Sequence, residues 1–236
     1  MSNGQSLGTL YGIGTGPGDP ELLTLKAVAT IQKCGVIAIP DTGNGEQTAF
    51  SIVQRYAAGK ELLQCHFTME MDLERRRAAR EVAAAEIIQV LKEGKDVGFV
   101  TLGDPTTYST YMYVHQIIAS QGFPAQIVPG ITSFAAAAAE LGISLCDGSE
   151  ALTVIPASHN DRLDELLDNP GNKVIMKSGK ALNRVLEKLK HHGYNQRTCI
   201  ASRVTMDGQR LYRSIEEYEE SPDPGYFTVA IVKEKI

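Results

Sequence analysis

Two glycine–acid–proline turns contain the residue types in this chain that are best suited to holding a ligand. Residues 10–26, LYGIGTGPGDPELLTLK, contain the first turn, and residues 102–105, LGDP, form the second. Glycine has no Cβ, so the backbone at these turns can approach a ligand closely, and an acid followed by proline suits the start of a helix. The pattern predicts recognition by backbone groups where a strand gives way to a helix. An isolated turn of this kind can equally be a tight connection that binds nothing.

The spacing of the first turn excludes two common nucleotide-binding loops. A dinucleotide fingerprint needs G-x-G-x-x-G, but counting from Gly12 puts Pro17 at the last position, and counting from Gly14 puts Asp19 there. A phosphate-binding P-loop ends in Gly-Lys followed by Ser or Thr, whereas Gly18 is followed by Asp19, whose charge repels a phosphate.

A third stretch, residues 128–133 with the sequence VPGITS, adds hydroxyl groups to this set. A helix is expected over residues 131–141, and its first turn leaves unpaired N–H groups beside Thr132 and Ser133. These two residues are therefore candidate ligand contacts. The alanine run that follows them indicates a closely packed helix.

Composition narrows the class of protein. The formal net charge of -5 gives no overall attraction to nucleic acid, and no apolar run approaches membrane-spanning length. The four cysteines, Cys34, Cys65, Cys146 and Cys199, include no C-x-x-C pair, so we expect neither a metal site nor a disulfide scaffold. The first residues, MSNGQSLG, lack the features of a signal peptide, and we expect a cytoplasmic protein.

Helix and strand patterns alternate along the chain, which predicts an α/β fold. We expect Asp19 to cap one helix with Pro20 at its first position, along which Leu22, Leu25, Val28 and Ile31 recur at helical spacing. Further helices are expected over residues 48–58, 72–93 and 107–121, and strands over 36–39, 62–67, 96–101 and 126–128. The inner face of the helix over 72–93 is expected to carry Ala79, Val82, Ala83, Ile87, Val90 and Leu91. After residue 145 we expect strands over 152–155, 173–176, 198–204 and 226–232, with antiparallel pairing near the end, and helices over 161–167 and 180–192.

We therefore predict two α/β domains, residues 1–129 and residues 130–236, the second with a mixed sheet. The polar segment 41–47, DTGNGEQ, follows the second strand and lies where ligands usually bind, although a solvated connection has the same composition. The arginines at residues 75–77 fit a solvated helical turn better than a binding patch.

Three stretches taken together, GIGTGPGDPELLTLKA, VTLGDPTTYSTY and VPGITSFAAA, resemble the tetrapyrrole methylases, which methylate corrin precursors with S-adenosylmethionine. Their order and spacing, and the final segment YFTVAIVKE, match that family over essentially the whole chain. The segments IAIPDTG and TLGDPTTYSTY most resemble the C20-methyltransferases of cobalamin synthesis, which act on precorrin-2 or cobalt-factor II.

The resemblance implies a homodimer whose subunits hold the methyl donor in a cleft between two domains, with the anionic tetrapyrrole along the N-terminal domain. Carried over by position, it places donor contacts at Pro17, Leu102, Gly103, Asp104, Thr107, Thr132, Ser133, Met176, Ala201 and Thr228. Methyl transfer from a sulfonium is an in-line displacement on an activated carbon, so we expect no protein-bound metal.

Substitution at a ring carbon also releases a proton, for which Asp41, Asp104 and Tyr108 are the candidate catalytic residues. Each has a structural alternative: loop solubility, turn capping and core packing, respectively. Arg75, Arg76, Lys177 and Arg203 are candidate partners for substrate carboxylates.

Other functions fit the same pattern. The enzyme could methylate another position of the corrin precursor, or resemble the methyltransferases of diphthamide formation, whose acceptor is a protein. A non-catalytic nucleotide-binding module could use the same glycine loops. Selective binding of S-adenosylhomocysteine over a panel of nucleotides separates the enzymes from the module.

Overall fold

The computed structural model describes residues 6–41, 48–68, 72–158, 161–219 and 225–234. The chain divides into two compact units, Met1–Thr132 and Ser133–Ile236. This division falls slightly after the boundary expected between residues 129 and 130. Each unit combines one five-stranded sheet with helices, so the predicted α/β class is confirmed.

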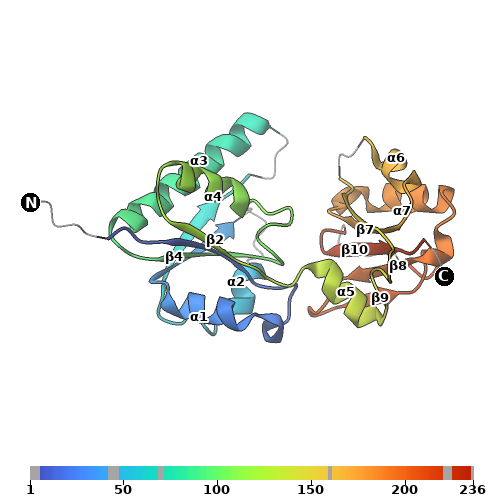
Figure 1. Cartoon of the computed structure of the whole chain (residues 1–236), viewed down its shortest axis with the longest axis horizontal. Helices are drawn as coiled ribbons and strands as arrows, with labels where there is room; N and C mark the ends of the chain where they lie inside the picture. Colours follow the sequence, from blue (N-terminus) through green and yellow to red (C-terminus); the bar gives the residue numbers. More distant parts are fainter. Residues whose placement is uncertain (1–5, 42–47, 69–71, 159–160, 220–224, 235–236) are drawn as a thin grey trace, which may run out of the picture. The chain divides into compact units, whose positions relative to one another are not determined.

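The first unit is a parallel sheet with the strand order β3-β2-β4-β1-β5. Its strands are β1 (Leu10–Gly14), β2 (Val36–Asp41), β3 (Glu61–His66), β4 (Val97–Thr101) and β5 (Ala125–Val128). Its α-helices are α1 (Leu25–Lys33), α2 (Thr48–Val53), α3 (Leu73–Lys92) and α4 (Tyr111–Ser120). Figure 1 shows α3 and α4 on one face of the sheet and α1 and α2 on the other.

Alternating residues of each strand supply the two cores of this unit. Val36 and Ala38 of β2 pack in the cluster with α3 and α4, whereas Ile37 and Ile39 pack in the cluster with α1 and α2. Successive side chains of a strand point to opposite faces, so a sheet covered on both faces needs apolar residues at every position. The nearly continuous apolar runs in the sequence follow from this arrangement.

The parallel strands bring their carboxyl ends to one edge of the sheet. The ladder between β2 and β4 includes Ala38 and Phe99 and stops there, while β2 continues beside β3 as far as Asp41 and β4 continues beside β1 as far as Thr101. The two halves of the sheet therefore no longer pair with each other at the edge where ligands of α/β proteins usually bind.

The helix expected to begin at Asp19 is in fact two elements. The Asp19 side chain accepts a hydrogen bond from the Glu21 N–H and caps only a 3₁₀ helix, η1 (Pro20–Leu22). A second cap, Thr24, accepts from the Ala27 N–H and begins α1. Leu25, one of the apolar residues at helical spacing, is 90% exposed as the first residue of α1.

The helices after β3 and β4 also differ in detail from the prediction. α3 is capped by Asp72 and buries Ala83, Ala84, Ile87, Ile88 and Leu91, but Val82, expected on the inner face, is 58% exposed. α4 begins at Tyr111, so Tyr108 lies in the preceding loop, where its φ of 50° is left-handed.

The second unit has the strand order β6-β7-β10-β8-β9. Its strands are β6 (Leu152–Pro156), β7 (Asn172–Met176), β8 (Thr198–Ser202), β9 (Arg210–Tyr212) and β10 (Thr228–Val232). Its helices are α5 (Ser133–Leu141), α6 (Leu163–Asp168), α7 (Leu182–His191) and the 3₁₀ helices η2 (Gly179–Ala181) and η3 (Asn195–Arg197). β10 pairs antiparallel with both β7 and β8, and β6 pairs parallel with β7, so the predicted mixed sheet is confirmed. The strand β9 was not predicted.

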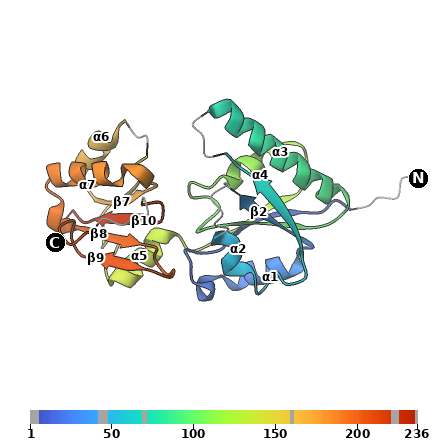
Figure 2. The same cartoon turned by 180° about the vertical axis from the view of Figure 1, so that it is seen from behind.

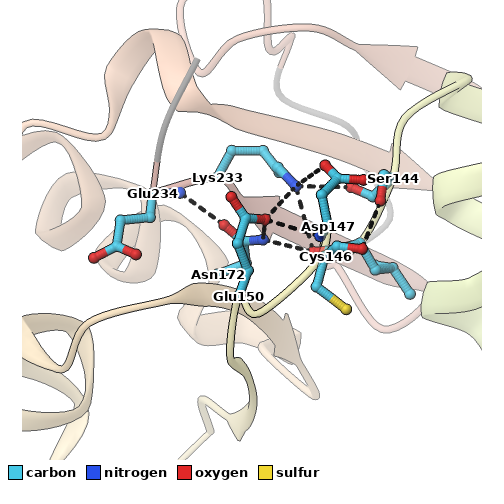
Figure 3. A network of polar contacts seen from close by, with 8 residues as sticks. Ser144, Cys146, Asp147, Glu150, Asn172, Lys233 and Glu234 are labelled. Carbon is cyan, nitrogen blue, oxygen red and sulfur yellow. Dashed lines mark hydrogen bonds and ion pairs between the residues drawn. The ribbon is translucent and has the colours of Figure 1, made fainter.

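A polar network fastens the connection between α5 and β6 to this sheet (Figure 3). The Lys233 ammonium donates to the Ser144 carbonyl over 3.1 Å and lies 3.5 Å from the Glu150 carboxylate. Buried Asn172 donates to the same Glu150 carboxylate over 2.8 Å and accepts from the Glu234 N–H. The Asp147 backbone N–H, which donates to Glu150 over 3.0 Å, and after it Asn172 and Lys233 keep the pKa of Glu150 below its usual value.

Among the helices that the structure describes, none combines the length and the apolar character needed to cross a membrane.

Candidate functional site

Three loops meet at the carboxyl edge of the first sheet because β1 lies between β4 and β5. The loops after β1 and β4 are joined by two backbone hydrogen bonds: the Gly103 N–H donates to the Gly16 carbonyl over 2.7 Å, and the Gly16 N–H donates to the Gly103 carbonyl over 3.2 Å. The two glycine–acid–proline turns of the sequence are thus held directly against each other.

The loop after β5 packs against the same junction through glycine. A Cβ on Gly130 would lie 2.2 Å from the Gly103 carbonyl oxygen and 2.8 Å from the Gly14 Cα. A Cβ on Gly14 would lie 2.6 Å from the Gly130 nitrogen. Because these neighbours are backbone atoms, no side-chain rearrangement could relieve such contacts, and glycine is required at both positions.

The Asp104 carboxylate connects the loops after β4 and β5. One oxygen accepts hydrogen bonds from the backbone N–H and the hydroxyl of Thr106, and the other accepts from the Gly130 N–H over 3.0 Å. The residue is buried, with 8% of its surface exposed. Both carboxylate oxygens therefore hold the loops in place.

Gly103 differs from the other two glycines of this junction, since its open side faces empty space. Its φ is +72°, and a Cβ there would meet nothing closer than the Ile131 carbonyl oxygen at 4.0 Å. The backbone conformation requires glycine, while the absent side chain leaves room for another molecule.

The remaining sites predicted in this unit lie on the same three loops. Pro17 is buried, whereas Leu102, Thr107 and Thr132 are half-buried. The Thr107 N–H donates to the Asp104 carbonyl over 3.3 Å. The structure thus places these residues, which the family resemblance assigns to the methyl donor, on three adjoining loops; Thr132, expected in the second domain, belongs to the first unit.

Asp41 lies farther along the same edge, at the end of β2. Its carboxylate is 2.9 Å from His66 Nδ1, and His66 is its neighbour across the β2–β3 ladder. Residues 42–47, which complete the segment predicted to border the substrate, lie outside the described residues.

In the second unit, Met176, Ala201 and Thr228 come from the neighbouring strands β7, β8 and β10. Ile175, Ile200 and Ala230 point into the core beneath α6 and α7. Since side chains alternate along a strand, Met176 and Ala201 point to the opposite face of the sheet.

The Thr228 side chain lies on the face toward α6 and α7, the same face as Ala230. Its hydroxyl pairs with that of Ser202 over 2.7 Å. On the face where Met176 and Ala201 lie, Thr228 therefore presents only its backbone.

The helix α5 begins later than expected. Ser133 is its first residue and Thr132 precedes it, so the expected start at residue 131 is two residues too early.

Comparison with known proteins assigns the chain to a family. The family model of the tetrapyrrole (corrin/porphyrin) methylases matches residues 9–218, which include all three glycine loops, the first sheet and every strand of the second sheet except β10. The chain belongs to the tetrapyrrole methylases.

Two curated relatives match this tetrapyrrole methylase over nearly its full length. A probable cobalt-precorrin-2 C(20)-methyltransferase of Methanocaldococcus jannaschii is 34% identical, covering 95% of each chain. The cobalt-precorrin-2 C(20)-methyltransferase of Salmonella typhimurium is 30% identical, covering 97% of each chain. Among solved structures, a cobalt precorrin-4 methyltransferase has a TM-score of 0.76 at 22% identity, covering 95% of this chain and 94% of that one, which shows the shared fold.

A metal site and a surface hollow were considered as alternatives to the glycine loops. The described residues contain no group of three or more His, Cys, Asp or Glu side chains that could hold a metal ion. A surface hollow of about 530 Å³ on α6 and α7 contains none of the predicted contacts; its lining residues are Asp164, Arg184, Glu187, Lys188, His191 and His192.

Sequence reasoning missed the role of Gly130, which appeared only as part of the stretch VPGITS, just after an expected strand. The signal that could have identified it is positional, because Gly14, Gly103 and Gly130 all stand at or just beyond the ends of strands that proved to be adjacent. Without the strand order, nothing in the sequence indicates that these three residues touch.

Proposed function

We propose that this chain is an S-adenosylmethionine-dependent methyltransferase that methylates C20 of the precorrin-2 ring, in its metal-free or cobalt-bearing form, during cobalamin biosynthesis. The observation that carries the proposal is the near full-length match to two C(20)-methyltransferases at 30% and 34% identity. The glycine-locked loops of the first unit supply a site that suits such a reaction. The names of both relatives favour the cobalt-bearing substrate.

We propose that the methyl donor contacts the residues that the family resemblance assigns to it. In the first unit these are Pro17, Leu102, Gly103, Asp104, Thr107 and Thr132, and in the second Ser133, Met176, Ala201 and the Thr228 backbone. The open side of Gly103 supports this assignment, because a ligand can lie against its backbone without meeting a side chain. Met176 and Ala201 are buried apolar residues that point to the same face of their sheet.

The proposed reaction depends on positioning. S-adenosylmethionine supplies a methyl group on a sulfonium, which is already activated for in-line transfer to an electron-rich carbon. Alignment of two bound reactants can lower a barrier by roughly 7 to 11 kcal/mol, without a metal or a nucleophilic side chain. Asp104, whose two oxygens hold neighbouring loops, fits the role of a positioning residue. Tyr108 and Asp41 remain the proposed proton acceptors.

Product analysis tests the proposal. The protein is incubated with S-adenosylmethionine and either metal-free precorrin-2 or cobalt-factor II, and the added methyl is located by mass spectrometry and NMR. A methyl at C20 is the expected result. A methyl at another ring carbon would contradict the regiochemistry, and binding of a nucleotide panel without any transfer would favour a non-catalytic module.

We also propose that the protein is a cytoplasmic homodimer. The family resemblance supports the dimer, and the biosynthetic enzymes that the chain resembles support the location. Light scattering after size-exclusion chromatography measures the mass in solution, and a value near 25.6 kDa, the mass of one chain, would contradict the dimer. Fractionation of the native host cells tests the location.

A further inference from the structure

Four arginines lie in the first two turns of α3, and two of them have local partners. Arg75 Nε is 3.6 Å from the carboxylate of Asp72, which caps the helix. Arg77 Nε donates to Glu81 over 2.8 Å. The charges of these two arginines are therefore balanced on their own helix.

Arg76 and Arg80 are the other two, and they stand one turn apart on one face of α3. Both are half-buried, and within the described part of the chain neither guanidinium has a carboxylate partner. Like charges four residues apart repel, and the positive end of the helix dipole adds to that repulsion. An anion bound at this face would relieve both effects.

Arg80 is already oriented for such an anion. Its guanidinium carbon lies 3.6 Å from the ring centroid of Tyr113, which belongs to α4 and is 49% exposed. α3 and α4 run side by side in both views of the molecule (Figures 1 and 2). A guanidinium that stacks on an aromatic ring is fixed in its plane while its N–H groups remain able to form a two-point contact with a carboxylate.

The face of α3 that carries Arg76 and Arg80 lies near the same edge of the sheet as the candidate site. α3 follows β3 and α4 follows β4, so the first turns of both helices lie near the carboxyl edge of the sheet, where the glycine loops also lie. Tyr108 stands in the loop between β4 and α4 and is 46% exposed. A large ligand at this edge would thus have a cationic pair beside it.

We propose that Arg76 and Arg80, with Tyr113 as the platform for Arg80, bind side-chain carboxylates of the tetrapyrrole substrate. This assignment rests on the proposed function, because it names residues that would recognise the acceptor of that reaction. It separates recognition of the acceptor on α3 and α4 from recognition of the donor at the glycine loops.

The test compares arginines of one helix. Arg76→Leu, Arg80→Leu and the double variant are measured beside Arg77→Leu, which removes the same charge from the same helix but from a residue that pairs with Glu81. We expect KM for the tetrapyrrole to rise about tenfold for each single variant and further for the double variant, since one charge-assisted contact is equivalent to about that factor. The Kd for S-adenosylhomocysteine should stay within about twofold throughout.

Two further measurements distinguish binding from a purely structural stack. Arg80→Lys keeps the charge without the planar fork, so KM should lie between those of the wild type and Arg80→Leu. Raising the salt concentration should increase KM more steeply for the wild type than for the double variant. Thermal unfolding of each variant reports any loss of packing between α3 and α4.

Failure of the proposed arginine site can be distinguished from failure of the proposed function. A double variant whose KM equals that of Arg77→Leu would overturn the inference, whether or not its Tm falls. Wild-type turnover of precorrin-2 or cobalt-factor II decides the proposed function independently. If neither is turned over, the same variants are compared by equilibrium binding of uroporphyrin III, a tetrapyrrole polycarboxylate. Equal affinity in all of them would again overturn the arginine site.

Discussion

The Asp104 carboxylate accepts a hydrogen bond from the Gly130 N–H over 3.0 Å, although the two residues follow different strands. We expect Asp104→Asn to lower the free energy of unfolding by about 1 to 3 kcal/mol, because the amide must turn an N–H group toward a backbone or hydroxyl donor. Affinity for S-adenosylhomocysteine should fall as well. Urea unfolding and calorimetric titration measure the two effects.

Asp19→Asn serves as the control for that variant. Asp19 caps η1 by accepting from the Glu21 N–H, and asparagine caps a helix about as well as aspartate. Stability and donor affinity should both remain close to wild type. Unchanged donor affinity in a measurably destabilised Asp104→Asn protein would contradict the positioning role of Asp104.

Gly103→Val should remain folded but lose donor binding. A β-branched residue at a φ of +72° is strained, which costs about 1 to 3 kcal/mol, and its side chain would enter the space beside the glycine junction. Gly122→Val is a matched control, since Gly122 has a φ of +84° with no atom within 4 Å of a Cβ, and it follows α4 away from the loops. Titration with S-adenosylhomocysteine should show a loss of at least about tenfold for Gly103→Val alone. Equal affinities in the two variants would remove Gly103 from the site.

Asp41→Ala should affect the acceptor and spare the donor. We expect a lower kcat/KM for the tetrapyrrole, while donor affinity stays within about twofold, equivalent to under about 0.5 kcal/mol. His66→Gln tests whether Asp41 acts through its neighbour, because the Asp41 carboxylate lies 2.9 Å from His66 Nδ1. Equal weakening of donor and acceptor binding would place Asp41 elsewhere than at the substrate.

Activity should need no added divalent metal. Among the residues that the structure describes, no cluster of ligand side chains suits a metal ion, and methyl transfer from a sulfonium requires none. Extensive chelation of the enzyme before assay, with any ring cobalt retained by the substrate, should leave turnover unchanged. Restoration of a lost activity by zinc or magnesium would show that this expectation is wrong.

The four cysteines should differ sharply in reactivity. Burial raises the pKa of Cys34 and of Cys65 to about 12, so both thiols stay protonated at pH 8 and react slowly as nucleophiles. Cys146 is exposed. Timed alkylation with iodoacetamide followed by mass spectrometry should label Cys146 well before Cys34 or Cys65 in the native protein and label all of them in urea. Early labelling of Cys65 in the native state would contradict its burial in the core.

Except for β9 and the 3₁₀ helices, the order of helices and strands could be read from the sequence, because each depends on local periodicity. The exact starts of the helices could not be read from the sequence. Asp19 and Thr24 are both competent caps, and local patterns do not decide which of them begins α1. The inner face of α3 was misplaced at Val82 because its many alanines fit either a buried or an exposed position.

The candidate site shows the same limit. Glycine–acid–proline turns are visible as motifs, and the resemblance supplied their role. The contact of Asp104 with Gly130 and the stack of Arg80 on Tyr113 depend on which strands and helices become neighbours. That information lies in the strand order β3-β2-β4-β1-β5, which local patterns do not encode.

The central position of β10 has a consequence for folding during synthesis. All five strands of the first unit have been made once residue 128 leaves the ribosome. In the second unit, β6 and β7 lie on one side of β10 and β8 and β9 on the other, so the two pairs cannot join until residues 228–232 are available. The first unit can therefore fold while the second is still being translated, and the second must wait with exposed strand edges for its middle strand.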